Sequence, residues 1–127
     1  MFLKMDYEDE AFKSTWRNGQ LTIRGKKMRD NTLSILKIIL DAAIAEEEFR
    51  LMWDLRDMVR PSISYWMSLL SFANANAHLL NKHTSKLVLL VSPRTKKWIT
   101  PMFRTIPPSC PYLITCDWKE MKFFISD

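Results

Sequence analysis

The segment Ser92-Pro93-Arg94-Thr95-Lys96-Lys97 combines a helix-start pattern with three basic side chains. Free N–H groups at a helix start attract anions, and nearby basic side chains strengthen this attraction. The segment therefore indicates either an anion-binding site or a solvated charged loop. Trp98 follows directly, and its large aromatic side chain would anchor a partner where it is exposed.

Patterns of catalytic residues are weak in this chain. Asp54 and Asp57 lie close together at the end of an apolar run, where their side chains point to opposite faces and make a poor acid–base pair. His78 and His83 have no third ligand beside them, and the motifs H-E-x-x-H, C-x-x-C and G-x-S-x-G do not occur. A pairing of Cys116 with either histidine stays open. We expect no enzymatic activity, no metal and no cofactor.

The composition is that of an ordinary globular domain. The 127 residues are 47% hydrophobic and 26% charged, with a formal net charge of +5. Two glycines are too few for a phosphate-binding loop, and two cysteines indicate a reducing compartment. The apolar runs are too short for a membrane span. Residues 1–10 are expected to form a flexible acidic segment, and they lack the apolar run of a signal peptide. We expect a single cytoplasmic domain over residues 1–127.

Several short patterns locate the strands. Asn18-Gly19 between two alternating runs predicts a β-hairpin over residues 12–24, in which Leu21 and Ile23 share one face. The apolar run 50–55 predicts a buried strand, and the aliphatic run 86–91 predicts a central strand covered on both faces. A last strand is expected over residues 112–116.

Helical periodicity accounts for the segments between the strands. One helix is expected over residues 33–44, and a long one from Ser62 to Leu80, with Ser62 as its N-cap. The outward positions of the long helix include His78 and Asn81. A short helix over 94–103 and a final segment over 117–125, capped by Asp117, complete the chain.

The resulting order, β-β-α-β-α-β-α-β-α, predicts an α/β fold. Its sheet would be mostly parallel, with four to five strands and an N-terminal β-hairpin at one edge. Ligands of such sheets bind beyond the carboxyl ends of the strands. That edge would carry the candidate partner-binding or anion-binding residues Asp57, Arg60, Ser92, Arg94 and Asp117, near Tyr65, Lys96, Lys97 and Trp98.

This order resembles the STAS domain family, the fold of bacterial anti-sigma-factor antagonists. The likeness is carried by residues 21–25, 51–55, 87–93 and 112–117, which are similar to successive strands of the family and the turns that follow them. In the family, a serine in the loop after the Asp-Leu strand is phosphorylated. The resemblance implies Ser62, with Ser64 beside it, as the regulatory phosphorylation site. The segment Arg60-Pro61-Ser62 departs from the family's usual signature.

Three functions follow as expectations. The resemblance favours a non-enzymatic regulatory module that binds a kinase or another signalling protein, switched by phosphorylation. The alternative is a domain that binds a small ligand, a lipid or an anion, with the eight methionines providing an adaptable apolar pocket. Nucleic-acid binding through Arg24, Lys26 and the other basic residues ranks lower and is not expected. A homodimer through Tyr65, Phe72 and Leu79 of the long helix is a further expectation.

Overall fold

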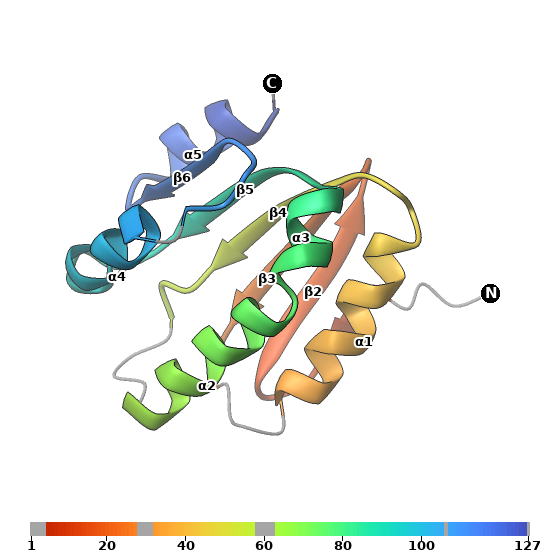
Figure 1. Cartoon of the computed structure of the whole chain (residues 1–127), viewed down its shortest axis with the longest axis horizontal. Helices are drawn as coiled ribbons and strands as arrows, with labels where there is room; N and C mark the ends of the chain where they lie inside the picture. Colours follow the sequence, from red (N-terminus) through yellow and green to blue (C-terminus); the bar gives the residue numbers. More distant parts are fainter. Residues whose placement is uncertain (1–4, 28–31, 58–62, 106, 127) are drawn as a thin grey trace.

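The fold is an α/β sandwich in which one mixed sheet carries helices on both faces. A computed structural model describes residues 5–27, 32–57, 63–105 and 107–126. The sheet has six strands in the order β1-β2-β3-β4-β5-β6, so every strand lies beside its neighbour in sequence (Figure 1). The expected fold class is confirmed.

The strands nearest the N-terminus are antiparallel. β2 (Phe12–Arg17) and β3 (Gln20–Gly25) form the predicted hairpin. Asn18 and Gly19 connect them with φ angles of 51° and 75°, as a type I′ turn requires. β1 (Tyr7–Glu8) pairs with β2 at the edge and adds one strand to those expected.

The remaining strands are parallel. β3 pairs with β4 (Phe49–Asp54), β4 with β5 (Thr84–Leu90), and β5 with β6 (Tyr112–Thr115). Leu51 is the register partner of Leu87, so the two aliphatic runs lie side by side as the sequence predicts. The ends of β4, β5 and β6 therefore meet at one edge of the sheet.

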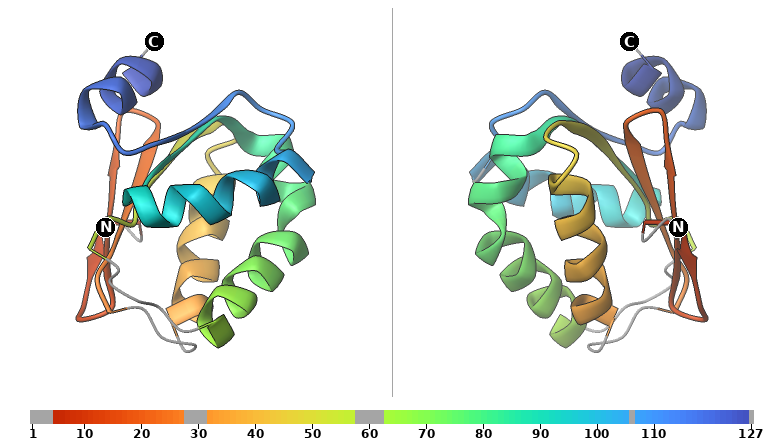
Figure 2. Two further views of the ribbon diagram at one scale, coloured as in Figure 1. Left: turned by 90° about the vertical axis from the view of Figure 1, so that its left-hand side faces the viewer. Right: turned by 90° about the vertical axis from the view of Figure 1, so that its right-hand side faces the viewer.

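Within the described residues, helices lie on both faces of the sheet (Figure 2). α1 (Thr32–Ile44), α2 (Ile63–Ala75), α3 (Ala77–His83) and α4 (Pro93–Thr105) lie on the first face. α5 (Trp118–Ser126) packs on β5 and β6 from the other side. Parallel strands alternate with helices along the chain, because each helix buries its apolar stripe on the sheet.

The core follows the two faces of the strands. Leu36, Leu40 and the other inward residues of α1 pack against Leu21 and Ile23 of β3. On the opposite face, Met121 and Ile125 of α5 pack against Met52, Val88 and Leu90. Val88, Leu89 and Leu90 are all buried, which confirms that β5 is a central strand covered on both sides.

The long helix expected over residues 62–80 is wrong in one respect, because it divides into α2 and α3. Asn76 lies between them with φ −104° and ψ 4°. Its side-chain amide donates to the carbonyl of Phe72 at 2.8 Å. Asparagine competes in this way for backbone hydrogen bonds and is a poor residue inside a helix. The break turns α3 toward the start of β5.

Candidate functional site

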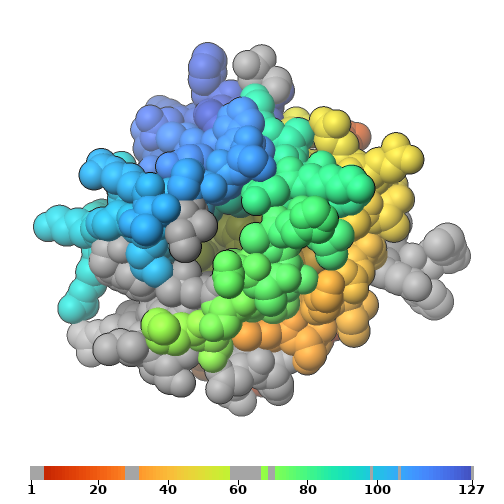
Figure 3. Space-filling view, viewed as in Figure 1, coloured from red at the N-terminus to blue at the C-terminus, as the bar shows by residue number. Residues whose placement is uncertain are grey.

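An apolar pocket lies between the sheet and the helices of its first face. Its lining comes from α1, α2, α3, α4, the central strands and the loop before β6. In the space-filling view the surface is hollowed between α2–α3, in green, and the blue segment that follows α4 (Figure 3). The pocket thus lies where the two parts of the helical layer do not meet.

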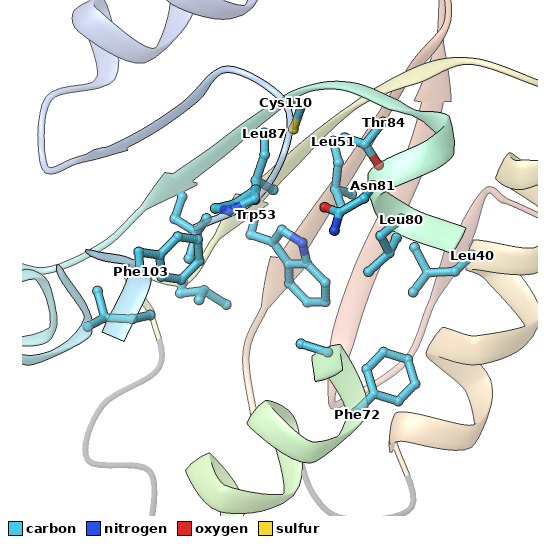
Figure 4. A pocket seen from close by; sticks show the side chains of 15 residues that line it. Leu40, Leu51, Trp53, Phe72, Leu80, Asn81, Thr84, Leu87, Phe103 and Cys110 are labelled. Atoms are coloured by element: carbon cyan, nitrogen blue, oxygen red, sulfur yellow. The ribbon is translucent and has the colours of Figure 1, made fainter. Parts of the chain in front are cut away.

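Strands β4 and β5 form the floor of this pocket. Leu51 and Trp53 of β4 and Leu87 and Leu89 of β5 point to the same face of the sheet and line it. The Trp53 ring extends toward the middle, with Phe72 of α2 across from the strands (Figure 4). The other apolar lining residues are Leu40, Leu55, Ala73, Leu80, Ile99, Phe103 and Pro108.

One side of the pocket is polar. Asn81 of α3, Thr84 at the start of β5 and Cys110 in the loop before β6 line it together (Figure 4). The Asn81 carbonyl oxygen accepts a hydrogen bond from the backbone N–H of Ser109 at 3.3 Å, which ties α3 to that loop. Burial raises the pKa of the Cys110 thiol, so the thiol stays neutral at physiological pH.

The Thr84 hydroxyl is the one buried side-chain polar atom without a hydrogen-bond partner in the part of the chain that the structure describes. Buried polar groups are nearly always hydrogen-bonded, because an unmet group loses its bond to water without replacement. Thr84 has 7% of its surface exposed. The hydroxyl oxygen is covered and its residue lines the pocket, so its hydrogen-bonding capacity is unfilled beside the pocket.

The size and lining of the pocket suit a small apolar molecule. Its volume is about 140 Å³. A closed cavity of about 150 Å³ lined by aliphatic and aromatic side chains accommodates a benzene-sized molecule, so this pocket, which opens to the surface, has room for one. Among the residues described, none that lines the pocket carries a charge. The arrangement can bind and orient a ligand, and it brings no acid–base pair to it.

The residues predicted for the carboxyl edge of the sheet lie outside the apolar pocket. Ser92 caps α4: its hydroxyl accepts the backbone N–H of Thr95 at 3.3 Å and donates to the Thr95 hydroxyl at 3.0 Å. Arg94, Lys96 and Lys97 follow it with exposed side chains. None of the four lines the apolar pocket, and their predicted role in partner or anion binding stays a prediction.

The predicted carboxylates are held in local contacts. Asp57 pairs with Arg24 at 2.6 Å on the surface, and Asp117 caps α5 through the backbone N–H of Lys119 at 2.9 Å. Asp54 is buried and accepts from both the backbone and the guanidinium of Arg56. The two aspartates near the end of β4 therefore take separate basic partners, which agrees with their rejection as an acid–base pair.

Several predicted residues cannot be placed. Arg60 and Ser62 lie outside the described residues, so the proposed phosphorylation site and its arginine have no structural account. For Ser64, Tyr65 and Trp98 the structure gives the helical backbone alone. Phe72, expected on a dimerising flank, packs against the core and lines the pocket.

Sequence reasoning missed the polar side of the pocket. Asn81 was expected to point outward and is indeed exposed, but it also lines the pocket, on the helix α3 that follows the break at Asn76. Thr84 was placed before the strand, whereas it is the first residue of β5. An asparagine in mid-helix was the available signal for the break.

A second, shallower hollow lies on the opposite face of the sheet, beside α5. Its lining mixes Lys13, Thr22 and Arg24 with Met52 and Trp118. The Arg56 guanidinium lies 5.6 Å from the centre of the Trp118 ring, and the cations there are partly neutralised by Asp54 and Asp57. The charged groups Arg24, Arg56 and Asp54 of this hollow are already paired, which favours the apolar pocket as the candidate site.

In the described ranges, no three His, Cys, Asp or Glu side chains gather as metal ligands. The helices there are also too short, or too polar, to cross a membrane.

Comparisons with protein-family models, curated proteins and solved structures found no match to this chain. What the structure shows is an α/β fold, whose described residues form a mixed six-stranded sheet with an N-terminal hairpin.

Proposed function

We propose that this protein is a small-molecule-binding domain whose ligand occupies the apolar pocket between the sheet and the helices α2, α3 and α4. The observation that carries the proposal is a pocket volume of about 140 Å³ within an apolar lining. Protein interiors are packed to the density of organic crystals, so an unfilled space of this size loses many contacts. A ligand that fills it regains those contacts and stabilises the folded state.

Binding would be weak for a minimal probe and stronger for a natural ligand with more atoms. For a ligand of about seven heavy atoms, affinities of roughly 0.1–1 mM correspond to about 4–5.5 kcal/mol. The test is a titration with toluene, followed by NMR chemical shifts of backbone amides. The expected shifts cluster on β4, β5 and α3.

Two alanines of α2 provide a matched pair for this test. Ala73 and Ala75 are both exposed, and only Ala73 lines the pocket. Ala73→Phe should place a ring at the opening and weaken toluene binding by about tenfold, whereas Ala75→Phe should leave the binding unchanged. Saturating toluene without amide shifts, or equal effects of the two substitutions, would refute the proposal. Native mass spectrometry of the purified protein would show a co-purified ligand.

The order of elements also supports a relation to the STAS family as a proposal. A hairpin followed by parallel strands alternating with helices is the arrangement that the resemblance of residues 12–125 implies. A structure of the complex with a signalling protein, docked at the end of β4 and the start of α2, would test this relation.

A regulatory interaction at the carboxyl edge is the second candidate function. It is favoured by the exposed basic start of α4, where Arg94, Lys96 and Lys97 follow the end of β5. Phosphorylation at Ser62 stays a prediction. Ser62→Asp and Ser62→Ala should then differ in the proteins they retain in a pull-down. Identical retention by the two variants would count against the switch.

A further inference from the structure

The strongest unexplained feature of the pocket is the unpartnered hydroxyl of Thr84. We propose that the ligand is a neutral, benzene-sized molecule with one hydrogen-bonding group, and that Thr84 Oγ1 binds this group. The inference rests on the proposed function and names its ligand class. Phenols and small alcohols are the simplest members of that class.

A β-bulge aims this hydroxyl at the pocket. Thr84 pairs with Phe49, but Arg50 pairs with Lys86, so Ser85 is an extra residue in β5. Without the bulge, strict alternation would place Thr84 on the face of Val88, beneath α5. The extra residue moves Thr84 to the face of Phe49, Leu51 and Trp53 instead. Bulges recur beside functional sites because they redirect a side chain in this way.

The local structure holds Thr84 firmly in this position. Its backbone N–H donates to the carbonyl of Leu80, which closes the C-terminus of α3. The Ser85 hydroxyl donates to the carbonyl of Phe49 at 3.3 Å, which secures the bulged strand to β4. The hydroxyl is therefore presented by a fixed backbone, as a specific ligand contact requires.

The hydrogen-bonding capacity of this side of the pocket defines the ligand group. The threonine hydroxyl both donates and accepts, and the Asn81 amide adds N–H donors while its oxygen is held by Ser109. A hydroxyl or carbonyl oxygen on the ligand would accept hydrogen bonds from the Thr84 hydroxyl and the Asn81 amide.

The ligand should also be uncharged. Within the described lining there is no cation to neutralise an acid and no carboxylate to neutralise an amine. An unpaired charge in an apolar pocket loses its hydration without compensation and is excluded. The neutral thiol of Cys110 does not alter this balance.

The test compares toluene and phenol, which are equal in size, with benzoate, which is charged and slightly larger. Dissociation constants are measured by NMR titration for the wild-type chain and for Thr84→Val, which keeps the branched shape and removes the hydroxyl. Thr84→Val should weaken phenol binding relative to toluene binding. The ratio of the phenol to the toluene dissociation constant should rise by about fivefold, the effect of one hydrogen bond. Benzoate should bind at least tenfold more weakly than phenol.

Two further variants complete the design. Thr84→Ser keeps a hydroxyl and should preserve the wild-type ratio, and Thr15→Val, on β2 away from the pocket, should also preserve it. If Thr84→Val left the ratio of the phenol to the toluene dissociation constant unchanged, or if benzoate bound as tightly as phenol, the inference would be overturned. Toluene binding to the pocket would still support the proposed function in that case. Absence of binding by every probe would overturn both.

Discussion

Leu51 of β4 and Leu87 of β5 are register partners, and both side chains line the apolar pocket. Because side chains alternate along a strand, the next residues, Met52 and Val88, face α5 instead. One pair of neighbouring strands therefore serves a ligand pocket on one face and a packed core on the other.

The two faces can be separated by substituting neighbours on β5. Leu89→Ala and Val88→Ala should each destabilise the fold, by about 2–4 and 1–3 kcal/mol respectively, because each removes buried methyl groups. Only Leu89→Ala enlarges the pocket, so it alone should bind a larger probe such as n-butylbenzene more tightly than the wild type does. Urea unfolding measures the free energy of unfolding, and NMR titration measures the affinity for butylbenzene. Equal changes in butylbenzene affinity for both variants would contradict the assignment of faces.

Thr84→Val should stabilise the protein without any ligand. The buried hydroxyl has no partner among the described residues, so folding costs it the hydrogen bond that water provides. Removing it should raise the free energy of unfolding by about 1 kcal/mol, which corresponds to a rise in Tm of roughly 3–6 °C. Differential scanning calorimetry measures this shift. A lower Tm would show that the hydroxyl has a partner in the folded state.

The Asp54–Arg56 pair should make stability depend on pH. Burial of Asp54 disfavours its charge, but hydrogen bonds from the side chain and backbone of Arg56 outweigh this effect and hold the pKa of Asp54 below its ordinary value. A carboxyl with a lowered folded pKa stabilises the protein above the unfolded pKa of about 3.9, and the contribution is lost as the pH falls through the folded pKa.

Asp54→Asn should therefore lower the free energy of unfolding by about 1–2 kcal/mol at pH 7, with a difference that shrinks below about pH 4. Chemical denaturation at several pH values measures it. Asp57→Asn is the control, because Asp57 pairs with Arg24 on the exposed surface and the solvent screens that pair. A difference for Asp54→Asn that stays constant down to pH 3 would contradict the electrostatic origin.

The hairpin turn allows a test of backbone strain alone. Gly19 has φ +75°, and no heavy atom lies within 4 Å of the position that a Cβ would occupy. Gly19→Ala should therefore destabilise the protein by about 1 kcal/mol through its backbone conformation, without a clash. Gly19→Asn should cost less, because asparagine tolerates this conformation. Thermal unfolding compares them, and equal losses for both would point to a cause other than the φ angle.

Much of the fold follows from local sequence patterns. Asn18-Gly19 determines the hairpin because few other residue pairs accept its φ angles. The aliphatic residues 87–91 specify a buried central strand, since no other position in an α/β fold covers both faces of a strand. The order of strands and helices then determines a parallel sheet with crossovers, and with it the meeting of β4, β5 and β6 at one edge.

The pocket was decided by tertiary structure. Asn81 and Thr84 have nothing unusual in their sequence neighbourhood, and alternation along the strand predicts the wrong face for Thr84. A bulge of one residue at Ser85 and a helix break at Asn76 bring them to the pocket, and the bulge depends on how β5 pairs with β4. The sequence by itself determined most of the strands and helices, because those choices depend on nearby residues. Only the folded chain decided where a buried hydroxyl has no partner, because that depends on distant segments meeting, or failing to meet, around it.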